Sequence, residues 1–318
     1  MSAGFFCDIL KQDSRAKARQ GKKDERSMKT ISGKAFAKLN LYLSVEGLRP
    51  DGYHELETVF QAVDLCDLVA ITVHRQGGIS LRCSLPYLPT DGRNLAVKAA
   101  ELFFELSGVQ NPGLNINIKK NIPVGAGMAG GSTDAACVLR LLNRAFGMPL
   151  GEKALYRSAQ SLGADVPFCL MGGTALAGGT GEKLRPIHTP ADLWFAIGKP
   201  AFSVSTRAAF QLFDQGGWGP GPGSGPLRQA MEAGDAAETG RLLYNSLELP
   251  VARQFPRITV LRQQLLEQGA LGARMTGSGS AVFGLFSARE PAEQAAQALR
   301  PFCRETFFAR ALCAGETK

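Results

Sequence analysis

A glycine-rich segment at residues 122–136 places the strongest constraint on the fold of this chain. It reads Ile-Pro-Val-Gly-Ala-Gly-Met-Ala-Gly-Gly-Ser-Thr-Asp-Ala-Ala, with four glycines within seven residues. Glycine adopts left-handed backbone conformations and lets the backbone approach a ligand closely. Ser132 and Thr133 are good helix caps, and apolar residues recur at helical spacing from Ala135 to Phe146. A helix should therefore begin behind the loop, with its free N–H groups and positive dipole end facing an anion.

The flanking residues favour a binding loop over a flexible connector. Residues 114–119 alternate as a strand does, so the order is strand, glycine-rich turn, helix. No lysine follows the last glycine, which excludes the common Gly-x-x-x-x-Gly-Lys-Ser/Thr loop. The segment resembles the signature of the GHMP kinases, the superfamily of galactokinase, homoserine kinase and mevalonate kinase. Its departures are small: Ala126 and Ala129 replace common glycines, Met128 the usual leucine, and Asp134 an occasional asparagine.

Composition limits the class of protein. The chain of 318 residues is long enough for two modest domains or one large one. Its seven cysteines are scattered and form no Cys-x-x-Cys motif, which favours a reducing cytoplasm and argues against zinc. No apolar run is long enough to span a bilayer, so we expect no membrane partner.

The net charge of +8 is unevenly distributed. Residues 1–37 hold nine basic and four acidic side chains, a net charge of +5, so only +3 remains for the rest. That mild excess suits an enzyme that handles nucleoside phosphates better than a nucleic-acid-binding module. We expect residues 1–27 to be a disordered basic tail, with an interaction arm as the alternative.

The order of elements predicts an α+β protein. Residues 34–45 alternate as a half-buried strand whose exposed face carries Lys38 and Asn40. Residues 215–226 are rich in glycine and proline and predict a surface loop. Strands are also expected at 68–73, 79–83, 114–119 and 166–170, helices at 94–106, 152–162, 226–232, 236–244 and 257–268, and a strand–turn–strand at 273–283.

The resemblance sharpens this prediction to the two-lobed GHMP kinase fold, with the active site in the cleft between the lobes. It implies an N-terminal, ATP-binding domain at 28–185 and a C-terminal domain at 186–318.

Phosphoryl transfer to an alcohol needs a triphosphate site, a cation beside the reacting groups and a carboxylate near the hydroxyl proton. Lys38 and Asp165 are the candidates for the cation and the carboxylate. Taken alone, Lys38 fits a solvated strand lysine and Asp165 fits a simple turn before a strand. Neither residue identifies a site by itself.

Five motifs in a fixed order change that interpretation. Together they resemble the branch of the GHMP kinases that acts on a cytidine-diphosphate-linked polyol, from about Lys34 to Phe286. The pair formed by the first two is specific, because homoserine and mevalonate kinases lack it. The motifs are Phe-Ala-Lys-Leu-Asn-Leu-Tyr-Leu at 36–43, Asp-Gly-Tyr-His-Glu-Leu at 51–56, the glycine-rich loop, Gly-Ala-Asp-Val-Pro-Phe at 163–168 and Thr-Gly-Ser-Gly-Ser at 276–280.

This resemblance implies an ATP-dependent kinase of the non-mevalonate (MEP) isoprenoid precursor pathway, which phosphorylates the 2-hydroxyl of its substrate. In the family pattern Asp165 is the base, and Lys38 orients the hydroxyl and stabilises charge. Because a carboxylate is a much weaker base than an alkoxide, Asp165 should accept the proton late, in a loose transition state.

The same resemblance assigns binding residues. Asn40 and Thr206 would line the substrate site, Tyr53 would stack on the cytosine, and His54 would hydrogen-bond its edge. The turn at 276–280 would support the cleft near the phosphates. ATP would be accompanied by Mg²⁺, for which no metal-ligating set is evident beyond a hydroxyl of Ser132 or Thr133. The expected ATP-binding residues are Pro123, Val124, Gly125, Ala126, Gly127, Met128, Ala129, Gly130, Gly131, Ser132 and Thr133.

Three alternatives stay open from the sequence. The chain could be another GHMP kinase of the homoserine or mevalonate type, which would not need Tyr53 and His54. It could be a non-catalytic nucleotide-binding homologue, although Lys38 and Asp165 are both present. A nucleic-acid-binding module would need basic and aromatic residues on one face. We expect a small-molecule substrate, no nucleic acid, and a monomer or weak homodimer.

Overall fold

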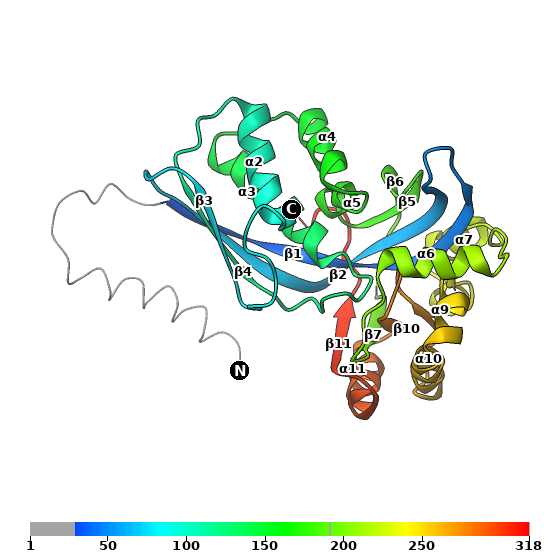
Figure 1. Cartoon of the computed structure of the whole chain (residues 1–318). Helices are drawn as coiled ribbons and strands as arrows, with labels where there is room; N and C mark the ends of the chain where they lie inside the picture. Colours follow the sequence, from blue (N-terminus) through cyan, green and yellow to red (C-terminus); the bar gives the residue numbers. More distant parts are fainter. Residues whose placement is uncertain (1–28, 191, 318) are drawn as a thin grey trace.

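The computed structural model describes residues 29–190 and 192–317, which fold into two lobes of mixed helix and strand (Figure 1). The predicted basic tail at 1–27 lies outside these residues. Among the described helices, none has both the length and the apolar character needed to cross a lipid bilayer.

The first lobe is built on a long antiparallel hairpin. Strands β1 (Lys29–Leu48) and β2 (His54–Val73) pair along their whole length, from Lys29 opposite Val73 to Leu48 opposite His54. The main path of the sheet runs β3-β4-β2-β1-β8, with β5 beside β2 and β6 beside β5. The remaining strands are β3 (Ile79–Cys83), β4 (Leu114–Lys119), β5 (Thr174–Gly178), β6 (Lys183–Ile187) and β8 (Tyr244–Asn245).

Helices cover one face of this sheet (Figure 1). They are α2 (Leu95–Ser107), α3 (Gly130–Ala145), α4 (Glu152–Leu162) and α5 (Val166–Met171). The Asn94 side chain caps α2 by accepting from the Ala96 N–H. Phe103 of α2 and Leu139 of α3 are fully buried against Ile71 of the sheet. This apolar layer fixes α3, and therefore the loop before it.

The second lobe is a sheet in the order β11-β7-β10-β9, covered by helices. Its strands are β7 (Trp194–Lys199), β9 (Gly272–Met275), β10 (Val282–Phe286) and β11 (Glu305–Arg310). Its helices are α6 (Thr206–Gln215), α7 (Gly225–Glu232), α8 (Ala236–Arg241), α9 (Glu248–Gln254), α10 (Arg257–Glu267), α11 (Arg289–Ala298) and the 3₁₀ helix η1 (Arg300–Phe302).

The chain crosses between the lobes repeatedly. Strand β8 pairs in parallel with β1, and the Leu312 N–H donates to the Ala62 carbonyl at 2.9 Å. Leu39 of β1 packs in one apolar cluster with Phe195 and Phe283 of the second lobe. Strand β1 is therefore covered from both sides.

The predicted half-buried strand at 34–45 is wrong in its burial. From Ala37 to Val45 every residue is buried, including Lys38 at 4% and Asn40 at 2% exposure. Helices of the first lobe cover one face and the second lobe covers the other, which strand alternation alone does not reveal. Three register shifts interrupt the pairing with β2, between Phe36 and Gly47.

Two further predictions are wrong. Residues 166–170 form helix α5 rather than a strand, and Pro167 stands in its first turn, where proline is favoured. The helix expected at 236–244 ends at Arg241, because Tyr244 and Asn245 pair with β1. The strand expected at 68–73 is only the end of β2, which begins at His54. The other predicted helices and strands are confirmed with small changes at their ends, and residues 216–224 form the glycine- and proline-rich loop between α6 and α7.

Candidate active site

The glycine-rich loop adopts the conformations that its sequence predicts. Gly125 and Gly127 have φ values of 63° and 75°, and Ala129 has a φ of 59° immediately before α3. Ser132 and Thr133 do not cap the helix, because it begins earlier, at Gly130. The first-turn N–H groups of a helix have no intrahelical acceptor, so those of α3 can bind an anion.

The loop rests on the second lobe through the turn at 276–280. A Cβ added to Gly127 would lie 2.1 Å from the Thr276 carbonyl oxygen. The Ala281 N–H donates to the Ala126 carbonyl at 3.3 Å, and a Cβ on Gly125 would lie 2.6 Å from the Ser203 hydroxyl. The candidate site thus lies where the two lobes meet.

Polar side chains of β1 point into this junction. The Lys38 ammonium donates to Asn40 Oδ1 at 2.7 Å, and Asn40 Nδ2 donates to the Thr58 hydroxyl at 2.9 Å. The Asn40 backbone N–H donates to the Thr276 hydroxyl at 3.1 Å. The Lys38 N–H donates to the Met128 carbonyl at 3.3 Å. Strand, loop and turn therefore hold the ammonium group in one place.

Asp165 faces this ammonium group from α5. Its Oδ1 lies 3.9 Å from Lys38 Nζ, and its side chain is 36% exposed, against 5% for Lys38. Asp165 precedes the first residue of α5, but its side chain accepts no capping hydrogen bond. The carboxylate is thus held beside a buried cation while one side stays open to a ligand.

A buried charge cluster lies behind the glycine-rich loop. The Lys120 ammonium donates to the Asp67 carboxylate, to Asp134 Oδ2 at 2.6 Å and to the Gly130 carbonyl at 3.3 Å. The N–H groups of Asn121 and of its neighbour donate to Asp67 Oδ1. Burial raises the pKa of Asp134 to about 7, opposed by Lys120 and assisted by the charge of Asp67. Lys120 therefore links the strand before the loop to the helix after it.

The predicted base-recognition residues lie together at the start of β2. Tyr53 is 66% exposed in a turn held by Asp51, whose carboxylate accepts from the Tyr53 N–H at 3.1 Å. The His54 Nε2 lies 2.7 Å from Asp214 Oδ1, and Phe210 stacks on its ring at a centroid distance of 4.7 Å.

Helix α6 connects this end of the site to the phosphate loop. The Thr206 hydroxyl lies 3.3 Å from that of Ser278, in the turn that supports the glycine-rich loop. Sequence reasoning found Thr206 but missed Phe210 and Asp214, which share its helix face at intervals of four residues. It also missed Thr58 and the Lys120 cluster, because each lies in an otherwise unremarkable strand or turn, and it assigned Thr276 to a supporting turn without its contact to Asn40.

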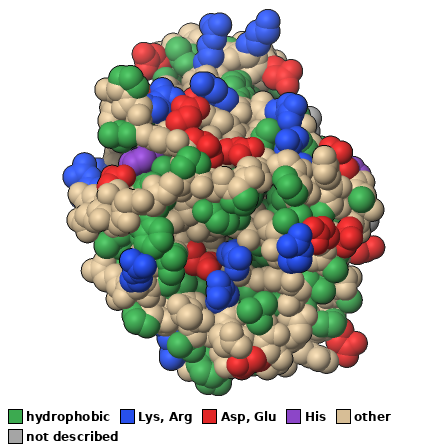
Figure 2. Space-filling model, turned by 90° about the vertical axis from the view of Figure 1, so that its right-hand side faces the viewer, with side chains coloured by type: hydrophobic (Ala, Val, Ile, Leu, Met, Phe, Trp, Pro, Cys, Tyr) green, Lys and Arg blue, Asp and Glu red, His purple; other side chains and the backbone are tan. Residues whose placement is uncertain are grey.

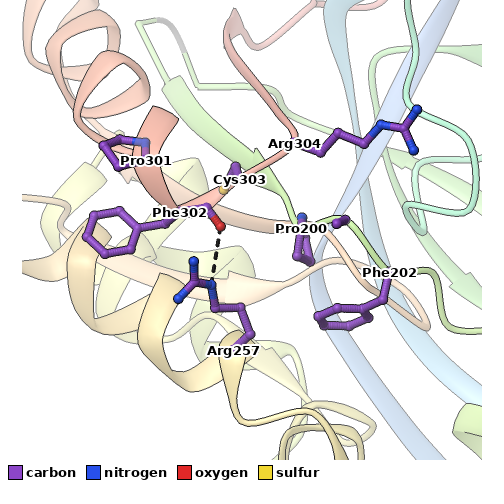
Figure 3. A pocket seen from close by; sticks show the side chains of 8 residues that line it. Pro200, Phe202, Arg257, Pro301, Phe302, Cys303 and Arg304 are labelled. Atoms are coloured by element: carbon purple, nitrogen blue, oxygen red, sulfur yellow. Dashed lines mark hydrogen bonds between the residues drawn. The ribbon is translucent and has the colours of Figure 1, made fainter.

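A separate hollow, shown in Figure 3, is lined in part by residues 200–202. Its volume is about 530 Å³, and Phe202, Arg257, Phe302, Cys303 and Arg304 are among the residues that line it. None of the predicted catalytic or binding residues lines it. Its wall is nonetheless linked to the site, because the Phe202 carbonyl accepts from the Ser280 hydroxyl at 2.6 Å.

The face of the molecule shown in Figure 2 gives no support to a nucleic-acid-binding module. On the face shown in Figure 2, basic and acidic side chains are interspersed, and the blue groups form no continuous patch. A nucleic-acid interface would gather basic residues on one face.

Comparisons with known proteins identify the family of this chain. The chain belongs to the GHMP kinases: residues 94–173 match the GHMP kinases N terminal domain and residues 227–305 match the GHMP kinases C terminal. The predicted α+β, two-lobed fold is thereby confirmed, as is a kinase that uses ATP and transfers a phosphoryl group to an alcohol. The predicted boundary at 185/186 stays a prediction.

The most similar of the relatives compared belong to one branch of the GHMP kinases. A 4-diphosphocytidyl-2-C-methyl-D-erythritol kinase from Caldicellulosiruptor saccharolyticus is 43% identical over 86% of this chain and 93% of its own length. The crystal structure of a 4-(cytidine 5'-diphospho)-2C-methyl-D-erythritol kinase matches with a TM-score of 0.75 and 37% identity, covering 90% of this chain and all of that one. The homoserine kinase of Cytophaga hutchinsonii, at 21% identity and a TM-score of 0.73, shares the fold.

Proposed function

We propose that this protein phosphorylates the 2-hydroxyl of 4-diphosphocytidyl-2-C-methyl-D-erythritol with ATP, in the non-mevalonate isoprenoid precursor pathway. The observation that carries the proposal is the Lys38–Asp165 pair, held beside a glycine-rich loop that opens α3. Relatives that bear this substrate in their names match most of the chain, at 43% identity over 86% of it and at 37% identity over 90% of it.

In the proposed reaction the ATP phosphates lie against the glycine-rich loop and the N-terminus of α3. The first N–H groups of that helix supply hydrogen bonds and a positive dipole end to the phosphate oxygens. Lys38, a buried cation, stabilises the negative charge on the transferred group and orients the attacking hydroxyl. Asn40 keeps the ammonium pointed at this position through its 2.7 Å hydrogen bond.

Asp165 accepts the hydroxyl proton in this proposal. Its carboxylate lies 3.9 Å from Lys38 and is open enough to reach an alcohol. A carboxylate cannot fully deprotonate an alcohol before phosphorus bonding begins, so the proton transfers late, as bonding to phosphorus develops. The proton then resides on the Asp165 carboxyl group.

The donor set fits a Mg²⁺ ion carried mainly by the phosphates. Ser132 is half-buried in the first turn of α3, and its hydroxyl is the protein ligand that we propose. Thr133 is buried, and its hydroxyl donates to the Gly130 carbonyl at 2.9 Å. When bound, Mg²⁺ neutralises phosphate charge.

The other end of the substrate is assigned to the start of β2. We propose that the exposed Tyr53 ring stacks on the cytosine, His54 hydrogen-bonds its edge, and Asn40 and Thr206 contact the polyol and diphosphate. Base stacking on an aromatic ring contributes about 1–3 kcal/mol.

We further propose a cytoplasmic location and a monomer or weak homodimer.

The test is ATP consumption with 4-diphosphocytidyl-2-C-methyl-D-erythritol, homoserine and mevalonate in parallel, with Asp165→Asn as the inactive control. Turnover of the cytidine-linked alcohol alone, with phosphorus NMR placing the new phosphate on the 2-hydroxyl, is the expected result. Turnover of either other alcohol instead would refute the substrate assignment while keeping the kinase mechanism. ATP binding without turnover of any of them would favour a non-catalytic homologue.

A further inference from the structure

One face of α6 holds the imidazole ring of His54. Asp214 lies 2.7 Å from Nε2, Phe210 stacks on the ring, and Phe213 meets it edge-on at a centroid distance of 6.4 Å. The His54 side chain is only 11% exposed. The ring is therefore fixed in orientation before any ligand arrives.

The position of Asp214 is not explained by the helix that carries it. Asp214 lies in the last turn of α6, which has no basic residue, and a negative charge near a helix C-terminus is unfavourable. Its side chain is 52% exposed, so packing does not require it either. Among the described residues, the Asp214 carboxylate makes its contact with His54.

The contact determines which nitrogen of His54 carries hydrogen. An ionised carboxylate can only accept a hydrogen bond, so Nε2 must be the donor. In the neutral ring the other nitrogen, Nδ1, then presents a lone pair. No group of the described residues hydrogen-bonds His54 Nδ1, which leaves that lone pair for a ligand.

We propose that Asp214 is a positioning residue that holds neutral His54 as the Nε2–H tautomer, so that Nδ1 accepts from the 4-amino group of a cytosine base. This inference deepens the proposed function and rests on it. Cytosine carries an amino donor at the 4-position, whereas a uracil base carries a carbonyl acceptor there. A lone pair at Nδ1 therefore favours cytidine-linked over uridine-linked substrates.

The first test compares the binding of cytidine 5'-diphosphate and uridine 5'-diphosphate by calorimetry. Asp214→Asn keeps the shape, but its amide can donate to Nε2 and stabilise the opposite tautomer, as in serine proteases. We expect the preference for cytidine 5'-diphosphate to fall roughly tenfold, the effect of one hydrogen bond. Asp214→Glu should recover part of the preference, and Gln211→Ala, on an exposed position of the same helix, should keep it.

The second test reads the tautomer directly by nitrogen-15 NMR. The chain has three histidines, so a histidine-labelled sample gives few signals, and His54→Gln identifies those of His54. We expect a protonated, pyrrole-like Nε2 and an unprotonated, pyridine-like Nδ1 in the unsubstituted protein. Asp214→Asn should shift both signals toward the opposite tautomer. This readout does not depend on catalysis.

The outcomes separate this inference from the proposed function. A proton on Nδ1 in the unsubstituted protein overturns the tautomer assignment whatever the substrate is. Kinase turnover of the cytidine-linked alcohol with an unchanged nucleotide preference in Asp214→Asn overturns this inference alone. If neither nucleotide binds and another alcohol is phosphorylated, both the cytosine assignment and the proposed function fail.

Discussion

The Lys38 ammonium lies 3.9 Å from the Asp165 carboxylate, and the two side chains come from a strand and from the residue before a short helix. Lys38 also donates to Asn40 Oδ1 and lies 5.0 Å from the centre of the Phe60 ring. Three groups thus fix one charge before substrate binds. Catalysis by such preorganised charge avoids the free-energy cost of reorienting dipoles during the reaction.

Asp165→Asn should lower kcat by about 10²- to 10⁴-fold, the usual contribution of a positioned proton acceptor. The amide keeps the shape of the carboxyl group but cannot take the hydroxyl proton. The Kd for ATP should change little, because the loop and α3 supply most of the phosphate contacts. Steady-state kinetics with calorimetric ATP titration measures both. A loss confined to ATP affinity would contradict the role of Asp165 as acceptor.

Lys38→Met and Asp165→Asn should be strongly non-additive in a double-mutant cycle. Each single variant disables the same pair, so the double variant should be little slower than the worse single one. The measurement is kcat/KM for all four proteins. If the losses of the two single variants multiply in the double variant, the two residues act in separate steps.

Gly127→Ala should destabilise the junction between the lobes. Gly127 has a φ of 75°, and an added Cβ would lie 2.1 Å from the Thr276 carbonyl oxygen. Backbone strain and the clash together should lower the free energy of unfolding by about 2–4 kcal/mol. Gly131→Ala is the matched control, since its Cβ would lie 3.8 Å from the nearest atom, in Leu95. Thermal unfolding of both variants measures the difference, and equal Tm values would contradict the close approach.

Asp134→Asn should change how stability depends on pH. Burial raises the pKa of Asp134 to about 7 in the folded protein, whereas an aspartate in an unfolded chain has a pKa of about 3.9. The folded state therefore binds the proton more tightly, so this contribution is full below about pH 4 and is lost as pH rises through about 7.

Asparagine removes that titration and can still accept from Lys120. The Tm of Asp134→Asn relative to the unsubstituted protein should therefore rise from about pH 5 to about pH 8. Thermal unfolding across that range measures it. Parallel profiles would mean that Asp134 stays ionised throughout.

Local sequence patterns predicted the glycine-rich loop, because its glycines and the helix behind it lie within one short segment. They also selected Lys38 and Asp165, although only through motifs spread along the chain. Patterns failed where distant residues decide the outcome. Lys38 is buried because the second lobe covers its strand. The direction of its ammonium group depends on Asn40, which is itself held by hydrogen bonds with Thr58 and Thr276.

Asp214 illustrates the same limit at the other end of the site. Nothing in its own helix marks it, and only the folded hairpin brings His54 within 2.7 Å of it. Helix α5 was mistaken for a strand because a short apolar run with a proline fits both interpretations. Proline at the start of a helix was the available signal.

Because β1 is buried on both faces, it couples the unfolding of the two lobes. The strand contributes Ala35, Leu39 and Leu43 to three different apolar clusters, and β8 extends its sheet from the far half of the chain. Neither half can melt without exposing this strand to water. The described lobes should therefore unfold in a single calorimetric transition, and a fragment ending between them should not fold alone.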